Sequence, residues 1–248
     1  MTRSLSLAVA LGALALTPAC AEKPANADTE VMTRGEVETI VREYLMENPE
    51  LIEEALIELG ERQRREEAEA ARKAITDNQD ALYNQASDPA IGPDDAEITV
   101  VEFFDYRCGY CKRSLDYIAA LPAKHDGRVR VVFKEYPILS PQSRQAALAA
   151  LAAKEQGKYF EMHTALMESD TRLEDEDIDT IAESVGVDVQ KMRADMKSTA
   201  VQQELADMTA LGRDLGVGGT PAFFIGEEAI EGANTPRITQ VIKEKLEG

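Results

Sequence analysis

Cysteine is scarce in this sequence, which has three in 248 residues: Cys20, Cys108 and Cys111. An exported domain that relies on disulfides for stability carries more cysteines at wider spacing, so a disulfide framework is excluded. Cys108 and Cys111 are three positions apart. A bond between them would close a loop too small to restrain the unfolded chain appreciably. The pair therefore calls for a chemical explanation.

Histidine is equally scarce, with His125 and His163 as the sole examples. A structural zinc site needs four ligands, and two thiols with two distant histidines do not supply it. The sequence therefore predicts no metal and no cofactor, and both histidines are interpreted as surface or packing residues. A two-thiol Cu(I) site at the cysteine pair remains an alternative, because soft thiolates select that ion.

Basic residues are in the minority: 27 Lys and Arg face 46 Asp and Glu, a net charge of −19. Such a surface repels nucleic acid and anionic membranes, so no nucleic-acid partner is expected. The hydrophobic fraction of 44% is sufficient for a folded core. The length suggests one domain with an additional segment.

The first 21 residues have the pattern of a signal peptide. Arg3 precedes the apolar run LSLAVALGALALTPA, and Ala19 and Ala21 have the spacing that a signal peptidase accepts. The sequence therefore predicts export to the periplasm. The less favoured alternative is a lipid anchor at Cys20, since Thr17 stands where lipoproteins usually have a branched apolar residue.

Residues 22–89 are predicted to form an N-terminal helical segment and stalk. A polar tether, 22–30, precedes two apolar stripes at helical spacing, separated by Asn48-Pro49, and a charged helix follows up to the Pro- and Gly-containing stretch SDPAIGPDD. The stripes include Val37, Ile40, Val41, Tyr44, Leu45, Leu51, Ile52, Ala55, Leu56 and Leu59. The pattern leaves two alternatives open: the helices fold back on the next domain, or copies of the chain associate through them.

Residues 90–248 have the order strand, helix, strand, helical insertion, hairpin and helix, which indicates an α/β fold. The strands are predicted at EITVVEFFD and RVRVVFKEYPI, the insertion at about 141–216, and the hairpin turn at Gly226-Glu227. Thr235 is predicted to cap the last helix, with Pro236 in its first turn.

The cysteine pair lies where a helix is predicted to begin. Free N–H groups and the helix dipole at Cys108 favour a thiolate, and Arg107, Lys112 and Arg113 add positive charge. Cys111, one turn further, is expected to be more buried, with a raised pKa. Such a pair can exchange disulfides: Cys108 attacks and Cys111 resolves the mixed disulfide.

Three segments resemble the DsbA-like disulfide oxidoreductases, which have a thioredoxin fold with an inserted helical domain. They are VEFFDYRCGYCKR, VRVVFKEYPIL and GGTPAFFIG. The resemblance implies that Cys108 is the nucleophile, that Cys111 is the resolving thiol, and that Thr220-Pro221 forms a cis-proline loop facing an extended client peptide. From the residues alone, an ordinary trans proline at a strand start is favoured there.

The same resemblance implies a buried acid–base pair beneath the helix. The family has an acid six residues before its first cysteine, which Glu102 matches, and commonly a lysine on the next strand, which Lys134 matches. Such a pair could shuttle the proton of Cys111.

Gly109 and Tyr110 stand between the cysteines, where the strongly oxidising members of the family have Pro-His. With Thr220 they are similar to the periplasmic disulfide isomerases, and IVREYLMENPELIEEAL resembles the trimerising N-terminal region of ScsC-like proteins. The resemblance implies a homo-oligomeric disulfide isomerase or reductase, with a trimer favoured. It would act on misoxidised clients and be kept reduced by a membrane partner. The alternatives are a monomeric dithiol oxidase and a copper-binding or chaperone-like oligomer.

Overall fold

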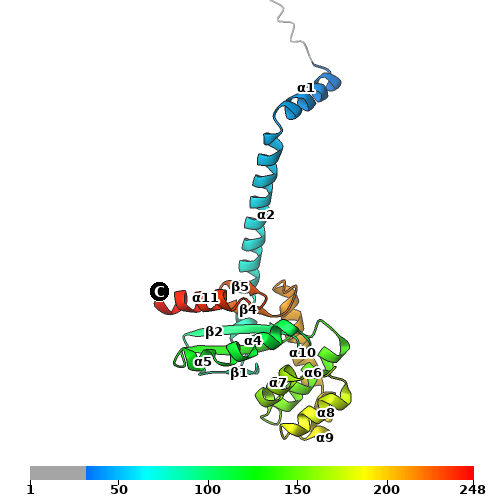
Figure 1. Cartoon of the computed structure of the whole chain (residues 1–248), viewed down its shortest axis with the longest axis vertical. Coiled ribbons are helices and arrows are strands. Elements are labelled where there is room, and N and C mark those ends of the chain that lie inside the picture. Colours follow the sequence, from blue (N-terminus) through cyan, green and yellow to red (C-terminus); the bar gives the residue numbers. More distant parts are fainter. Residues whose placement is uncertain (1–31) are drawn as a thin grey trace, which may run out of the picture. The chain divides into compact units, whose positions relative to one another are not determined.

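The computed structural model describes residues 32–248, which form two compact units (Figure 1). The first unit ends at Glu58 and the second is Leu59–Gly248, with the boundary inside helix α2 (Glu50–Asp77). The predicted signal peptide, Cys20 and the polar tether lie outside the described residues.

The first unit consists of helix α1 (Arg34–Glu47) and the start of α2. Thr33 caps α1 through a capping box with Glu36, which satisfies N–H groups at the helix start. No residue of α1 is buried. The apolar stripes predicted from the sequence are present and are largely exposed within this chain, as at Val37, Ile40, Val41, Tyr44, Ile52 and Leu56.

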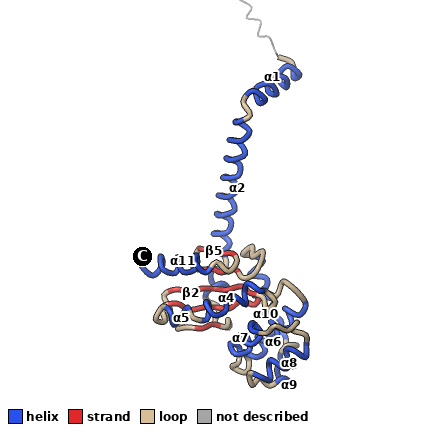
Figure 2. The backbone as a smooth tube through the Cα atoms, viewed as in Figure 1, coloured by secondary structure: helices blue, strands red, loops and turns tan. Residues whose placement is uncertain are grey.

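The second unit is built on a mixed sheet, whose strands are red in Figure 2. The sheet has five strands in the order β1-β3-β2-β4-β5. Strands β2 (Ile98–Phe104) and β3 (Val129–Glu135) are parallel, while the remaining pairs are antiparallel. Strands β4 (Ala222–Ile225) and β5 (Glu228–Glu231) form the predicted hairpin. Strand β1 (Ala90–Ile91) was not predicted, because two residues within a loop-like stretch carry no strand pattern.

Helices connect and cover the strands in the predicted order. Helices α4 (Gly109–Ala119) and α5 (Leu121–Lys124) join β2 to β3. The insertion between β3 and β4 contains α6 (Pro141–Lys154), α7 (Tyr159–Glu168), α8 (Asp175–Ser184), α9 (Val189–Asp195) and α10 (Thr199–Asp214), grouped together beside the sheet (Figure 1). Helix α11 (Thr235–Glu247) ends the chain, and its N-cap is Asn234 and not the predicted Thr235, because the Asn234 side chain accepts from the N–H of Arg237.

Alternating residues of β2 and β3 build two cores, one on each face of the sheet. Val100, Phe104 and Phe133 pack with the cysteine helix and the insertion. Val101, Phe103 and Val132 pack on the other face with residues from α2 and α3 (Gln79–Tyr83). Each candidate catalytic side chain on β2 or β3 therefore lies on one face of the sheet or on the other.

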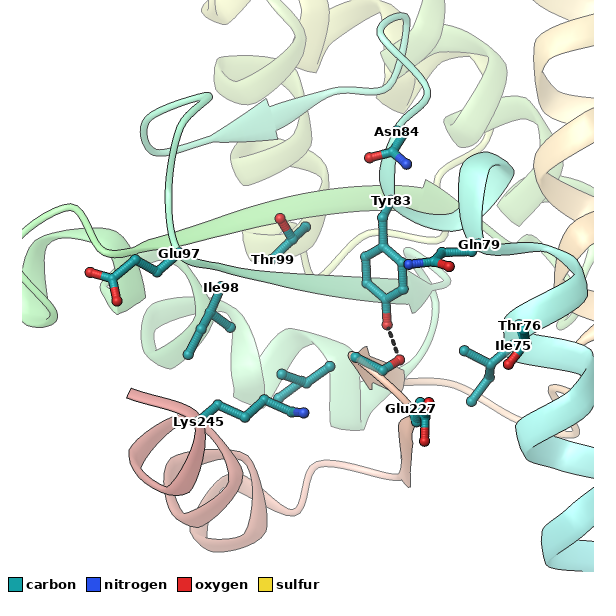
Figure 3. A pocket seen from close by; sticks show the side chains of 12 residues that line it. Ile75, Thr76, Gln79, Tyr83, Asn84, Glu97, Ile98, Thr99, Glu227 and Lys245 are labelled. Atoms are coloured by element: carbon teal, nitrogen blue, oxygen red, sulfur yellow. Dashed lines mark hydrogen bonds between the residues drawn. The ribbon is translucent and has the colours of Figure 1, made fainter. Parts of the chain in front are cut away.

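The end of α2 and helix α3 belong to the second unit. Ile75 and Leu82 are buried in the sheet core, and the Tyr83 hydroxyl donates to the Gly226 carbonyl over 2.8 Å (Figure 3). The predicted domain start at residue 90 is therefore too late, because apolar residues of the expected stalk complete this core.

Candidate functional site

The loop between β2 and α4 holds Cys108 in place. The Asp105 carboxylate accepts the N–H groups of Arg107 and Leu139 over 2.8 and 2.9 Å, and the Asp105 carbonyl accepts the N–H of Cys108 over 3.0 Å. Cys108 is the N-cap of α4, and its sulfur accepts the N–H of Cys111 over 3.4 Å. The nucleophile predicted from the sequence is thus fixed at a helix N-terminus.

The Cys108 sulfur is surrounded by hydrogen-bond donors. The pKa of Cys108 is lowered to about 5, chiefly by the hydrogen bond with the Cys111 thiol and further by hydrogen bonds from Thr220 and from the backbone of Cys111 and Tyr110, against the opposing effect of burial. A sulfur with this pKa is a thiolate at neutral pH, which is the form that attacks disulfides.

The basic residues near Cys108 do not contribute as the sequence suggested. Lys112 donates to backbone carbonyls at the end of α7, including that of Met167 at 2.9 Å. Arg113 lies over the Tyr110 ring, 4.2 Å from its centroid, and Arg107 reaches Gln142 over 3.5 Å. Hydrogen bonds, and not these cations, are the main causes of the lowered pKa of Cys108.

Cys111 differs sharply from its neighbour. It is 1% exposed, and burial raises its pKa far above the ordinary value of a thiol, with further contributions from the hydrogen bond to Cys108 and the charge of Glu102. Neither Cys108 nor Cys111 is in a disulfide in this structure. The pair thus combines a thiolate with a protonated thiol, in agreement with the expected greater burial of Cys111.

Glu102 lies on β2, on the sheet face that carries α4, and is 4% exposed. Burial and the charge of Cys108 raise the pKa of Glu102 to about 8, although a hydrogen bond from Ser114 opposes the shift. Its charge also raises the pKa of Cys111, so the two groups lie within electrostatic reach. A buried carboxyl with a pKa near 8 can exchange protons at physiological pH.

The predicted pair between Glu102 and Lys134 does not form. Lys134 is 2% exposed, but in the β2–β3 register it pairs with Phe103, whereas Glu102 pairs with Phe133. Successive side chains of a strand point to opposite faces, so Lys134 and Glu102 are separated by the sheet. Lys134 instead forms a buried ion pair with Asp88 and donates to the Ala81 carbonyl over 2.7 Å. Its assignment as a proton shuttle for Cys111 is corrected accordingly.

The Thr220-Pro221 peptide bond is cis, as the family resemblance implied and as the residues alone did not. The Cys108 sulfur lies 3.1 Å from the Thr220 carbonyl oxygen, which brings the loop against the nucleophile. A groove of about 470 Å³ adjoins this contact, lined by Tyr110, Thr220 and Pro221 together with Gly218, Gly232 and Glu231. Tyr110 is 60% exposed. The glycines and Glu231 of the groove were not predicted from the sequence.

A buried polar network beneath the site was also missed. The hydroxyls of Tyr106 and Tyr159 each donate to Glu135 over 2.8 Å, and Tyr106 lies 3.2 Å from Nδ1 of His163. Burial lowers the pKa of His163 to about 3 and raises that of Glu135 well above its usual value. His163 is thus a neutral packing residue, as expected, and the network joins the loop before Cys108 to α7. Glu135 gave no clue in the sequence beyond its place in an apolar strand.

Other features of residues 32–248 lie apart from the cysteines. A pocket of about 400 Å³ opens between α2, α3, the hairpin turn and α11, lined among others by Gln79, Glu227 and Lys245 (Figure 3). Among the described residues no group of three or more His, Cys, Asp and Glu side chains could hold a metal. Nor does any helix within 32–248 combine the length and apolar character needed to cross a membrane.

Two protein families match this chain. Residues 99–240, which include both cysteines and the cis-proline loop, match the family described as DSBA-like thioredoxin domain. Residues 34–67, which include α1 and the first part of α2, match the family described as copper resistance protein ScsC N-terminal domain.

Solved structures agree with these matches. A thioredoxin-like oxidoreductase from Silicibacter pomeroyi is 35% identical, with a TM-score of 0.66 over 69% of this chain and 99% of the other. ScsC from Proteus mirabilis, in a transitional conformation, is 30% identical, with a TM-score of 0.64 over 86% of this chain and 96% of the other.

A curated relative, the Na⁺/H⁺ antiporter NhaA 3 of Salinispora tropica, is 34% identical over 145 residues, or 54% of this chain. The chain spans about a fifth of that relative's length, 21%. The match to the DSBA-like domain covers more than half of the chain and contains the whole cysteine site. The chain therefore belongs to the family of DSBA-like thioredoxin domains.

Proposed function

We propose that the protein is an exported thiol–disulfide oxidoreductase that acts on client proteins through Cys108 and Cys111. The observation that carries this proposal is the Cys108 thiol, whose pKa is lowered to about 5 beside an open groove. The Cys108 thiolate attacks one sulfur of a client disulfide, and the other client sulfur leaves as a thiolate that takes a proton. A mixed disulfide with Cys108 results.

Two routes release the client. Cys111 can lose its proton and attack the Cys108 sulfur, which leaves a Cys108–Cys111 disulfide and a client reduced by two electrons. Alternatively, another client thiolate attacks the client sulfur of the mixed disulfide, forms a new client disulfide and restores the Cys108 thiolate without net oxidation. In the first route we propose that Glu102, whose charge acts on Cys111, accepts the Cys111 proton.

Isomerisation is the activity we favour. The raised pKa of Cys111 keeps it protonated and slow to attack, which gives a client thiol time to resolve the mixed disulfide. The pKa of Cys108 lies between those of thioredoxin, about 7, and DsbA, about 3.5, so its disulfide is expected to be less oxidising than that of DsbA. The Gly109-Tyr110 dipeptide points the same way.

An oligomer, with three copies favoured, would complete the proposed isomerase. Apolar side chains of α1 and early α2 are exposed, and a pocket between them is lined by Val37, Val41, Leu45, Met46 and Ile52. Such faces need a partner, and the match of residues 34–67 to the ScsC N-terminal domain supports a second copy of the chain as that partner. Several sites facing one client suit repeated exchange.

The proposed setting is the periplasm, reached through the signal peptide, with a membrane redox partner that keeps the cysteine pair reduced. Isomerisation needs reduced Cys108 at the start. A reductant must therefore reduce the Cys108–Cys111 disulfide each time Cys111 has released a client.

The test is reactivation of a test enzyme that carries scrambled disulfides, by the chain from residue 22 onward in a mild reducing buffer. Isomerase activity predicts reactivation at substoichiometric protein and its loss in Cys108→Ser. If the protein accelerates only the oxidation of the reduced test enzyme, the dithiol oxidase is the function and the isomerase proposal is rejected.

A copper-binding or chaperone-like oligomer is the candidate from another class, supported by the description of the family that residues 34–67 match. It predicts that Cys111→Ser protects clients from aggregation as well as the native chain does. Loss of protection together with loss of thiol exchange would remove this candidate.

A further inference from the structure

The groove beside Cys108 carries one acidic side chain. Glu231 is the last residue of β5 and pairs in register with Ala222, the residue that follows the cis proline. The hydrogen bond from the Gly232 N–H to the Pro221 carbonyl, 2.8 Å long, holds this end of the hairpin against the loop. The Glu231 carboxylate therefore stands at the border of the surface that receives the client segment.

Glu231 differs from Glu228, the other acid of strand β5. The Glu231 side chain is exposed, and its carboxylate forms no hydrogen bond or ion pair with any of residues 32–248. Glu228, on the same strand, is bound to Arg237 over 3.1 Å. No other residue that lines the groove is charged. The residues that line the groove thus present one unpaired negative charge, and Thr220 of the same groove contacts the reacting sulfur.

We propose that Glu231 makes the groove select client segments with a lysine or arginine near the reacting cysteine. The inference rests on the proposed function, since it concerns the substrate of the same thiolate. A cation within a few ångströms of Glu231 gains Coulomb energy, whereas an anion is repelled, and both effects are weakened by salt. The occupant is an extended segment of a client protein.

Arg113 contacts Tyr110, a residue that lines the groove, and the positive charge of Arg113 would favour the opposite choice. Its guanidinium forms a cation–π contact with the Tyr110 ring. Arg113 does not itself line the groove. The free carboxylate therefore decides the preference.

The experiment measures the rate at which the reduced protein attacks short peptides. Each peptide carries one cysteine in a disulfide with a chromogenic thiol, and lysine, glutamine or glutamate two positions before or after that cysteine. At low ionic strength the lysine peptide should react about 3- to 10-fold faster than the glutamate peptide, the size expected for one exposed ion pair and one repulsion. At 0.5 M salt the difference should shrink to less than about 2-fold.

Glu231→Gln should bring the lysine and glutamate peptides to within about 1.5-fold of each other at low salt. Glu228→Gln makes the same change in net charge on the same strand, away from the groove, and should retain the preference. Equal rates in the native chain, a preference for glutamate, or a lysine preference that survives Glu231→Gln would overturn the inference. If no peptide reacts at Cys108, the proposed function itself has failed, and the inference fails with it.

Discussion

At the scale of single residues, the two cysteines lie one helical turn apart and have very different pKa values. Cys108 lies at the N-cap, where backbone N–H groups and the Cys111 thiol donate to its sulfur. Cys111 lies inside the helix against apolar side chains and Glu102, where a negative charge is costly. The start of the helix therefore makes one cysteine, Cys108, a nucleophile and the other, Cys111, a resolving thiol that loses its proton with difficulty.

We predict that alkylation of reduced Cys108 follows a titration with a midpoint near pH 5. Cys111→Ala removes the main hydrogen bond to the Cys108 sulfur. The midpoint of Cys108 alkylation in this variant should therefore rise by about one pH unit or more. The rate of iodoacetamide labelling between pH 3 and pH 9, followed by mass spectrometry, measures both. A midpoint near 8 in the native chain would show that the thiolate is not stabilised.

The same pKa makes the stability of the reduced protein depend on pH. The pKa of Cys108 in the folded state lies below its ordinary value of 9.0. The stabilisation is therefore fully present above about pH 9 and is lost as the pH falls through about 5. Urea unfolding of Cys108→Ala should lack this component.

Glu102→Gln tests the proton acceptor of the resolving step. A glutamine cannot take the Cys111 proton, so release of the mixed disulfide through Cys111 should slow by at least about tenfold, while the first attack by Cys108 is retained. Stopped-flow quenching with a peptide disulfide separates the two steps. An unchanged release rate would remove Glu102 from the mechanism.

The measured stability of Glu102→Gln shows whether this variant is folded, which is the control for the experiment on the resolving step. The pKa of Glu102 is raised from 4.5 to about 8, so the stability of the native chain is highest below pH 4.5 and falls as the pH rises through 8. Glutamine does not ionise. The variant should therefore gain about 3 kcal/mol relative to the native chain between pH 4 and pH 7.

At the scale of helices and strands, alternate side chains of β2 and β3 lie on opposite faces of the sheet, and this decides which buried charged groups can form pairs. Glu102 lies on the cysteine face, and Lys134 lies on the face that packs against α3. Lys134 and Lys154 donate to the carbonyls of Ala81 and Ser87, so two lysines hold α3 and the segment that follows it. The buried lysine is thus an anchor for this segment.

Lys134→Met should lower the free energy of unfolding by about 3 to 5 kcal/mol, because Asp88 would remain buried without its partner. The rate of exchange at Cys108, per folded molecule, should not change. Lys73→Met breaks an exposed pair with Asp77 and should cost less than about 1 kcal/mol. Guanidinium unfolding measures the stabilities; a folded Lys134→Met protein with slow exchange would restore a catalytic role for Lys134.

The sequence allowed prediction of most elements but of few contacts between them. Apolar alternation predicted β2 and β3, and helical spacing predicted the insertion, because these patterns are local. The cysteine pair was visible in the residues themselves, whereas Glu102 and the cis proline were predicted only through the family resemblance of continuous segments. The Lys134–Asp88 pair and the approach of Glu231 to the groove depend on strand register and on residues far apart in the chain, which a single sequence does not encode visibly.

At the scale of the whole molecule, the two units have different packing. The unit Leu59–Gly248 has a buried core on both faces of its sheet, including Ile75 from α2. The unit ending at Glu58 leaves its apolar side chains exposed. The proposed association between copies through this first unit would give those side chains a partner.

A chain that begins at Leu59 should be monomeric and folded, because it keeps Ile75 and Leu82 of the domain core. The chain from residue 22 onward should have about three times the monomer mass. Val41→Glu should dissociate it, and Glu43→Gln, a neighbouring position outside the apolar pocket, should not. Light scattering measures the masses. A monomeric parent chain would disprove association through α1 and α2.

Reactivation of the scrambled test enzyme by these two chains, at equal concentrations of active sites, tests the central claim most directly. If an oligomer of stabilised thiolates isomerises client disulfides, the chain from residue 22 onward reactivates the enzyme at least about five times faster than the chain beginning at Leu59, while both chains have equal Cys108 alkylation rates. Equal reactivation by the two chains would contradict the claim, since the N-terminal helices would then contribute nothing to the exchange of client disulfides.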